Sequence, residues 1–301
     1  MNEIETTPQI YDGKQARKHA EQLSRHADMK QHADKLIRGF EKLNNDTAKR
    51  AVWELIQNAC DLSDNNEAEV TIDYSNDGFS FTHNGKPFNS STFISLIKQV
   101  SDKTDDESVG EFGTGFITTH SFGRRFRISS YLKEQNSYIE IKDFEIDRSA
   151  RESADLAIAL ATQETRVYEL LEKGTQVEPQ VIKTTFTYIP ETPKQREYIK
   201  VSAATIAEYI PIVLTLSKKL KSVTVIKEDG TKCYYELGET KPVNGINVTP
   251  IITEAEPIEV FWLRDEKKCV TVILPFKADR VANPENDQVS KIFVYYPLIG
   301  T

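Results

Sequence analysis

One segment of the chain carries three polar residues at a helical spacing. Glu54, Asn58 and Asp61 stand at i, i+4 and i+7 of Glu54-Leu55-Ile56-Gln57-Asn58-Ala59-Cys60-Asp61. A helix therefore places all three on one face, roughly opposite an apolar stripe. Carboxylates move protons, and amide oxygens bind hard cations such as Mg²⁺. Two interpretations stay open: a face that a second element covers to make a pocket, or a polar face in solvent.

A second segment follows a predicted strand and reads His83-Asn84-Gly85-Lys86-Pro87-Phe88. Gly85 allows the backbone to pass close to a flat ligand, because glycine has no Cβ atom. The alternative is an ordinary strand-to-helix turn.

A third segment is rich in glycine and reads Val109-Gly110-Glu111-Phe112-Gly113-Thr114-Gly115-Phe116. Its amides can face an anion at the start of a helix. It is neither the GxxxxGK[ST] phosphate loop nor the GxGxxG dinucleotide motif. The alternative here is a flexible loop.

In this order and spacing, the three segments resemble the GHKL superfamily (Bergerat fold). This is the ATP-binding domain shared by DNA gyrase, the ninety-kilodalton heat-shock chaperones, histidine kinases and MutL. The helix is similar to the family's N box, and the glycine-rich segment to its lid motif as found in the heat-shock and sacsin branch. Ser101-Asp102-Lys103 resembles the sacsin version. The resemblance covers roughly residues 15–217, with a fainter similarity to a transducer-like domain around 291–298.

The resemblance implies that the protein binds ATP and Mg²⁺. It implies that Asn58 is the metal ligand, that Glu54 is the general base and that Asp61 lies on the adenine side. Thr184 matches a strand threonine beside the adenine. The phosphate-facing group that it implies consists of Lys103, Gly110, Phe112, Gly113, Thr114, Gly115 and Phe116.

The second segment departs from the family pattern. The family reads adenine with the Asp of a D-x-G-x-G motif, whereas His83 and Pro87 stand at the Asp and second Gly positions. A neutral His83 can accept a hydrogen bond from the adenine amino group, and Asn84 offers a donor and an acceptor. We therefore expect nucleotide affinity to fall as the pH drops through about 6.5. The alternative is His83 as a capping or core-edge residue.

The surrounding sequence predicts the elements that position these segments. Helices are expected over 14–43, 46–62 (with Asp46 as N-cap), 90–99 and 194–220, the last kinked at Pro211. Strands are expected over 69–74, 79–83, 125–132, 137–142, 184–189, 222–227, 232–236, 257–263, 268–274 and 291–296. A hairpin turn is expected at Asn76-Asp77-Gly78, a charged loop over 101–111 and partly helical structure over 145–180. His19, His26, His32, His120 and Trp53 are expected to be structural or solvated.

This pattern predicts an α+β fold, a two-layer α/β sandwich followed by a smaller strand-rich α/β domain. The expected domains are 1–220, which binds ATP, and 221–301, the start of a second domain in a truncated chain. The 301 residues carry a net charge of −8, which argues against broad nucleic-acid binding. No secretory signal and no membrane-length apolar run is found, and Cys60, Cys233 and Cys269 share no disulfide or zinc spacing. A cytoplasmic location is expected.

The leading functional hypothesis is a weakly active Mg²⁺-dependent ATPase that couples lid closure and dimerisation to a chaperone-like or effector cycle on a protein partner. A nucleotide-sensing scaffold that does not hydrolyse ATP is the first alternative. A histidine kinase catalytic domain is the second, although the phospho-acceptor motif is absent.

Overall fold

The computed structural model describes residues 13–65, 67–74, 78–99, 115–265, 267, 270–277, 280–281, 293–294 and 296–297. The helices are α1 (Gly13–Phe40), α2 (Asn45–Asp61), α3 (Ser90–Lys98), the 3₁₀ helix η1 (Gly115–Ser121), α4 (Ser153–Lys173) and α5 (Pro193–Leu216). The strands are β1 (Ala68–Asp73), β2 (Phe79–His83), β3 (Arg125–Glu134), β4 (Ser137–Asp147), β5 (Gln176–Val177), β6 (Thr184–Ile189), β7 (Leu220–Ile226), β8 (Lys232–Leu237), β9 (Lys241–Val243), β10 (Ile246–Thr253), β11 (Ile258–Asp265), β12 (Val270–Lys277), β13 (Arg280–Val281), β14 (Phe293–Val294) and β15 (Tyr296–Pro297).

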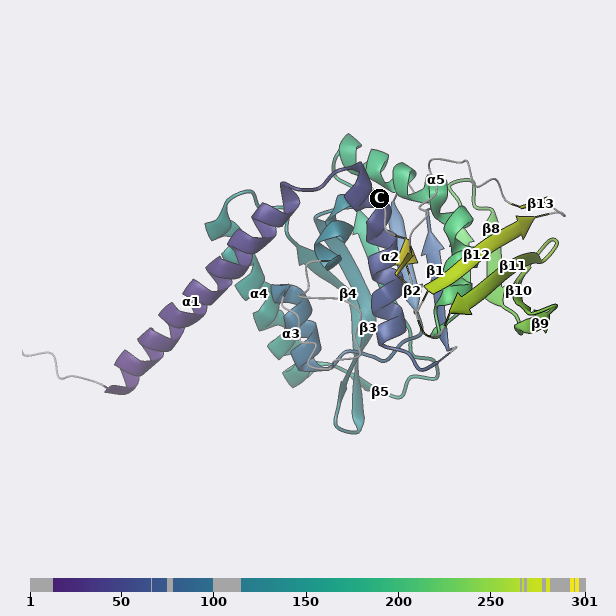
Figure 1. Ribbon diagram of the computed structural model, residues 1–301. Coiled ribbons are helices and arrows are strands. Elements are labelled where there is room, and N and C mark those ends of the chain that lie inside the picture. The colour runs from purple at the N-terminus through teal and green to yellow at the C-terminus, as the bar shows by residue number, and fades with distance from the viewer. Residues whose placement is uncertain are drawn as a thin grey trace, which may run out of the picture.

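One mixed sheet organises the described residues (Figure 1). Its order is β13-β12-β11-β10-β8-β7-β1-β2-β6-β3-β4-β5, with β9 paired to β10. β1 and β7 are parallel, whereas β1 and β2, β2 and β6, and β6 and β3 are antiparallel. β1 pairs with β7, and β2 pairs with β6, so the centre of the sheet brings together segments that lie far apart in the sequence.

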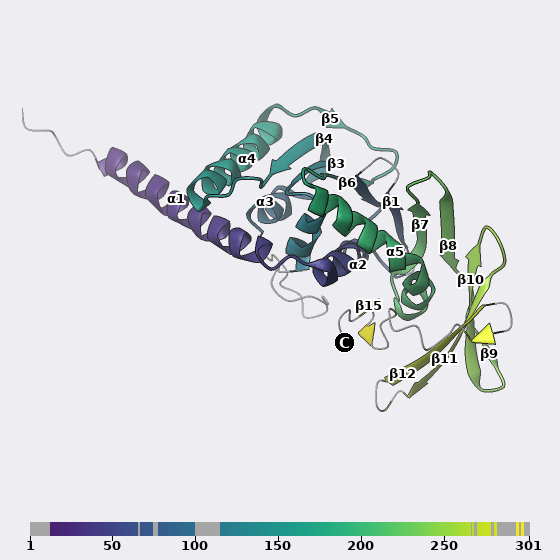
Figure 2. The same ribbon diagram turned by 90° about the horizontal axis from the view of Figure 1, so that it is seen from above.

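The two faces of the central sheet differ in polarity. Phe79, Phe81 and His83 of β2 are buried, while the residues between them are partly exposed. On the more exposed face, Thr82 and Thr185 join β2 to β6 through their hydroxyl groups, 2.9 Å apart. The helices cover the buried face (Figures 1 and 2). This arrangement confirms the predicted two-layer α/β architecture.

Only the C-terminal part of the first helix, α1, contributes buried residues. Every residue of α1 from Gly13 to Asp28 is exposed, and its buried residues are Met29, Ala33, Leu36 and Phe40. Figure 1 shows the N-terminal part of α1 extending away from the body of the molecule. His19 and His26 lie in this exposed part, as expected for a solvated helix.

The last long helix is bent. Its segments Pro193–Ala204 and Ile206–Leu216 meet at 56°, on the N-terminal side of Pro211. A proline lacks the amide hydrogen that a helix interior needs, so a bend in this helix was predicted. Among the described residues, no single helix has the length and hydropathy of a membrane span; the two bent segments of α5 meet that test only when taken together.

The sheet continues beyond residue 220. β7 lies between β1 and β8, so it extends the sheet that also contains β2, β6 and β3. The division into domains at 220/221 stays a prediction. The sequence analysis missed β9 and β10, which a turn at Asn244 and Gly245 connects. Both of these residues have positive φ, at 51° and 82°, as a tight hairpin requires.

Candidate functional site

The polar face of α2 forms where the sequence predicts it. The helix begins with a capping box in which Asn44 and Thr47 exchange hydrogen bonds, so the N-cap is Asn44 and the expectation of Asp46 was wrong. Its opposite side is buried, and the Trp53 ring meets Tyr209 of α5 edge-on at 5.9 Å. The three candidate residues Glu54, Asn58 and Asp61 are partly exposed. The helix is thus anchored through its apolar side and presents its polar side outward.

Gly115 brings the end of the glycine-rich segment to this face. A Cβ atom added to Gly115 would overlap the carboxylate of Glu54, so the two residues are in direct contact. Glycine is needed here because any side chain would displace that carboxylate. Two segments that are far apart in sequence therefore meet at Glu54. Lys103, Gly110, Phe112, Gly113 and Thr114 lie outside the described residues.

The segment after β2 packs against the C-terminal end of α2. A Cβ atom added to Gly85 would lie 2.9 Å from Leu62 Cβ and 3.3 Å from the Ala59 carbonyl oxygen. The Lys86 amide donates a hydrogen bond to the Leu62 carbonyl oxygen, at 2.9 Å. The other two predicted segments therefore both contact α2, one near Glu54 and one past Asp61.

His83 is a buried residue in a fixed tautomer. Its side chain is 4% exposed, and the Gly85 amide donates a hydrogen bond to its Nδ1 atom at 3.1 Å. The accepting nitrogen carries no proton, so the neutral ring carries its hydrogen on Nε2 and offers a donor there. Burial lowers the pKa of His83 to about 4.

Two expectations for His83 therefore change. In this tautomer the ring donates a hydrogen bond at Nε2, whereas the sequence analysis expected it to accept one from adenine. The imidazole also stays neutral at pH 6.5, so titration of His83 gives no reason for nucleotide affinity to fall near that pH. The sequence does not reveal the shift, because it results from burial beside Phe186, whose ring centroid lies 6.3 Å away.

Asn84 has a structural role in which each of its side-chain groups bonds to the backbone. Its Oδ1 accepts a hydrogen bond from the Glu69 amide at 2.8 Å, and its Nδ2 donates one to the Glu67 carbonyl oxygen at 2.9 Å. These bonds fasten the end of β2 to the start of β1. The expectation that Asn84 reads adenine is not supported by these contacts.

Thr184 lies beside His83. The two residues are paired across β2 and β6, and Thr184 is fully buried. Its hydroxyl group lies 2.7 Å from the Ser130 hydroxyl of β3. Phe116 is also buried, and its ring packs near His120 and Phe126. Phe116 therefore belongs to the core beneath the site.

Arg148, which directly follows β4, is a fully buried arginine that was not predicted from the sequence. Its guanidinium donates hydrogen bonds to the Leu96 and Ile97 carbonyl oxygens and to Gln99 Oε1, at 2.6, 3.0 and 2.8 Å. It also contacts His120 Nε2 at 2.7 Å. Burial lowers the pKa of Arg148 to about 10, so the group stays charged at neutral pH.

This cluster connects the end of α3 to η1. His120 is buried and its pKa is held well below the usual value by burial and by Arg148. A neutral His120 accepts from Arg148 at Nε2 and donates from Nδ1 to the Ile117 carbonyl oxygen, at 3.2 Å. Since η1 begins at Gly115, Arg148 helps to fix the helix whose first residue contacts Glu54. No motif identifies such an arginine, because its partners are backbone carbonyls distant in sequence.

Part of the chain matches a known family. Residues 46–177 match the family model described as "Histidine kinase-, DNA gyrase B-, and HSP90-like ATPase". No curated protein matches the chain. Among solved structures, the B-subunit of the DNA gyrase from Myxococcus xanthus is similar with a TM-score of 0.40 and 10% identity; the alignment covers 72% of this chain and 62% of that one. The segment that carries Glu54, Asn58 and Gly115 is similar to GHKL-type ATPase domains, the superfamily that the three sequence motifs resemble.

Proposed function

We propose that this protein binds ATP together with Mg²⁺ and hydrolyses it to ADP and phosphate. The observation that carries the proposal is the contact between Gly115 and the Glu54 carboxylate. It joins the glycine-rich segment to the polar face of α2, within the stretch that is similar to GHKL-type ATPase domains.

Glu54 is the general base of this proposal. Its carboxylate takes a proton from a water molecule as that water attacks the γ-phosphorus. A new oxygen–phosphorus bond forms, the bond between the γ-phosphorus and the bridging oxygen breaks, and ADP leaves with the electron pair. Such a reaction needs mainly positioning and charge stabilisation, which suits a site with one carboxylate at a fixed place.

Asn58 fits the role of a metal ligand one helical turn from Glu54. Its side chain is partly exposed. Among the described residues, no three His, Cys, Asp or Glu side chains gather to hold a metal. A single amide oxygen from Asn58 suits Mg²⁺, which usually takes one or two protein ligands and completes its coordination shell with phosphate and water. Bound Mg²⁺ would neutralise charge on the phosphate oxygens.

The remaining assignments rest on the resemblance and on position. Asp61, His83, Gly85 and Thr184 form the adenine side of the proposed site. The backbone around Gly115 forms the phosphate side, to which the resemblance adds Lys103, Gly110, Phe112, Gly113 and Thr114. The proposal also includes a cycle of lid closure and homodimerisation acting on a protein partner in the cytoplasm, as in the heat-shock and sacsin branch. Residues 221–301 would belong to a second domain.

Calorimetric titration of ATP, with and without Mg²⁺, tests the binding step. We expect wild-type protein to bind ATP only weakly without Mg²⁺, and Asn58→Ala to lose the effect of the metal. Gln57→Ala is the matched control, because it removes an amide from the neighbouring position of the same helix. If Asn58→Ala and Gln57→Ala bind ATP–Mg²⁺ alike, Asn58 is not the ligand.

Phosphate release tests the chemical step. We expect Glu54→Gln to bind ATP and to lose turnover by about 100-fold or more, as for removal of a general base. Unchanged turnover in Glu54→Gln would exclude this residue as the base. Dimerisation is tested by measuring the molar mass in solution with a non-hydrolysable ATP analogue.

A nucleotide-sensing module without hydrolysis is the second candidate. The observation in its favour is the altered adenine motif: His83 is buried as a donor at Nε2, and both polar groups of Asn84 are bonded to the backbone of Glu69 and Glu67. ATP binding without measurable phosphate release in the wild-type protein would establish this candidate.

A further inference from the structure

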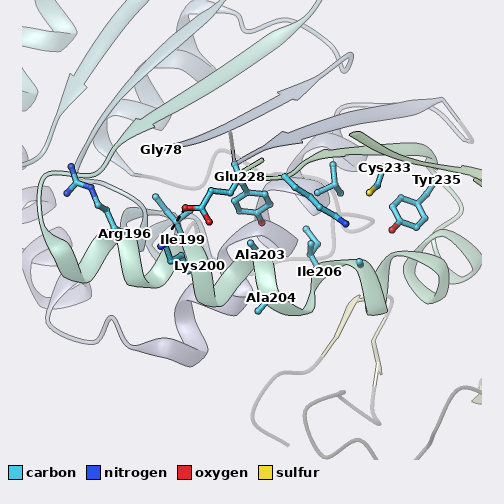
Figure 3. Close-up of a pocket in the computed structure, with 14 residues that line it drawn as sticks. Gly78, Arg196, Ile199, Lys200, Ala203, Ala204, Ile206, Glu228, Cys233 and Tyr235 are labelled. Atoms are coloured by element: carbon cyan, nitrogen blue, oxygen red, sulfur yellow. Dashed lines mark ion pairs between the residues drawn. The ribbon is translucent and has the colours of Figure 1, made fainter. Parts of the chain in front are cut away.

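A cavity of about 430 Å³ lies between α5 and the strands β7 and β8, next to Tyr74, which directly follows β1 (Figure 3). This volume falls within the range of roughly 300–1,000 Å³ that small-molecule sites occupy. None of the residues that line it belongs to the proposed nucleotide site. Figure 2 shows α2 on one side of α5, and β7 and β8 on the other. The cavity is therefore separate from the polar face of α2.

The walls of this α5 cavity are largely apolar. Ile199 and Ile206 come from α5, Val225 from β7 and Tyr235 from β8. The hollow exists because α5 presents small residues to the sheet, among them Ala203. Val225 is paired with Cys233 across β7 and β8, so the cavity floor is part of the sheet. An aliphatic chain placed here would leave water for an apolar surface.

Charged residues also line the cavity, and most of them are basic. They are Arg196 and Lys200 of α5, and Lys227 and Glu228 at the end of β7. Lys200 and Glu228 form an ion pair with their charged atoms 3.6 Å apart. Figure 3 places Arg196, Lys200 and Glu228 towards one end and Tyr235 and Cys233 towards the other.

The positive charge exceeds the negative charge along this lining. Once Lys200 and Glu228 are paired, Arg196 and Lys227 remain, and neither forms an ion pair with another described residue. Two cations beside an apolar wall complement a molecule with an anionic head and an apolar tail. Cationic side chains form strong, charge-assisted hydrogen bonds with carboxylates.

We infer that the α5 cavity binds a fatty carboxylate of medium chain length. The aliphatic chain lies along α5, between Ala203 and the Val225–Cys233 pair. The carboxylate lies at the end of the cavity where Figure 3 places Arg196. This site is independent of the proposed ATPase activity, so its test does not depend on nucleotide binding.

Calorimetric titration with decanoate tests the inference, with decanol and decyltrimethylammonium as the uncharged and cationic comparisons. We expect saturable binding of one decanoate, at least 10-fold weaker binding of decanol and none of the cation. Equal affinity for decanoate and decanol would overturn the carboxylate assignment. Failure of decanoate to saturate would overturn the site.

Two pairs of variants locate the ligand. We expect Ala203→Trp to fill the cavity and abolish binding, while Ala154→Trp, the same change at an exposed position of α4, has no effect. We expect Arg196→Glu to weaken decanoate at least 10-fold and to leave decanol unchanged. Lys218→Glu, an exposed lysine outside the cavity, is its control. Equal loss in Arg196→Glu and Lys218→Glu would show a general effect of charge and overturn the assigned head-group position.

Cys233 gives a readout that needs no bulky variant. Its side chain is partly exposed in the cavity lining, whereas Cys60 is buried. We expect decanoate to slow alkylation of Cys233 by N-ethylmaleimide several-fold in the wild-type protein, as measured on the Cys233 peptide by mass spectrometry. An unchanged alkylation rate at saturating decanoate would place the ligand elsewhere, even if Ala203→Trp fails to fold.

Discussion

The Glu54 carboxylate lies against a residue that has no side chain, and this contact can be tested by a single methyl group. A Cβ atom at Gly115 would overlap that carboxylate, and the flexible end of Glu54 would move away. We expect Gly115→Ala to lower turnover by about 100-fold, since displacing a reacting group by about 1 Å has effects of this size. ATP affinity and the melting temperature are expected to change little, because only a side-chain end is displaced. A parallel loss of affinity and turnover would argue that Gly115 serves in binding.

His83 links stability to pH. Its pKa is about 4 in the folded protein and about 6.5 in the unfolded chain, so the unfolded chain takes up a proton first as the pH falls. The contribution of neutral His83 to the free energy of unfolding is fully present above pH 6.5 and is lost between about pH 6.5 and 4. From pH 7 to pH 5 we expect a loss of about 2 kcal/mol from this residue.

Urea unfolding at the two pH values measures this loss. The variant His83→Gln does not titrate in this range, so its stability is expected to fall by about 2 kcal/mol less than that of the wild type. The same slope in both proteins would show that His83 is not the source. His120 is also buried, with a pKa well below its usual value, and adds to the slope in both.

Asn84 is expected to affect the stability of the protein and not its affinity for nucleotide. Its two side-chain groups bond to the backbone of Glu69 in β1 and of Glu67 just before that strand. We expect Asn84→Ala to lower the free energy of unfolding by about 1 kcal/mol, the usual size for lost hydrogen bonds of a partly exposed residue. Nucleotide affinity, measured by calorimetry, is expected to be unchanged. A large loss of affinity at unchanged stability would return Asn84 to the nucleotide site.

At the scale of single residues, the sequence is a better guide to which residues lie close together than to the role of each side chain. Glu54 and Gly115 are found together as the motifs imply. The tautomer of His83 and the bonds of Asn84 depend on backbone atoms of Gly85, Glu67 and Glu69, whose positions no motif encodes. Local hydrogen bonding to backbone therefore decides roles that residue type leaves open.

Arg148 shows how one side chain joins several elements. It connects the end of β4 to the last turn of α3 and to η1. We expect Arg148→Met to lower the free energy of unfolding by about 3 kcal/mol or more, because it leaves buried carbonyl oxygens and His120 Nε2 without a donor. Arg148→Lys keeps the charge and is expected to lose less. Urea unfolding measures both.

A surface arginine is the control for Arg148. Arg127 of β3 is half exposed and lies 3.6 Å from Glu145. We expect Arg127→Met to change stability by less than about 1 kcal/mol, as for exposed ion pairs. Similar losses at the two positions would contradict a special role for the buried cluster.

Regular elements with a clear period were predicted well. The strands over 79–83 and 184–189 have the predicted bounds, and the helix at 90–99 differs by one residue. The misses have local causes. The hairpin of β9 and β10 depends on positive φ at Asn244 and Gly245, and that signal was overlooked. The N-cap of α2 fell on Asn44, since both Asn44 and Asp46 are residue types that favour this position.

At the scale of the whole molecule, the strand order indicates that the segment matching the family model is too short to fold by itself. The segment 46–177 contains β1, β2, β3 and β4, but it lacks β6, the strand that lies between β2 and β3. We expect the isolated segment 46–177 to show no cooperative unfolding transition by circular dichroism. A piece covering 13–237 restores β6, α5, β7 and β8, and is expected to unfold cooperatively. Cooperative unfolding of the short segment would show that its two hairpins fold without β6.

The parallel pairing of β1 and β7 also has a consequence for synthesis. The ribosome makes the residues of β1 about 150 positions before those of β7, and β1 keeps an open edge until its partner emerges. During that interval the nascent chain holds two hairpins, β1–β2 and β3–β4, without the strand that joins them. Long-range pairing of this kind is slow and leaves unpaired edges exposed. The rate of translation between residues 147 and 226 therefore sets how long this chain presents free strand edges to its neighbours in the cell.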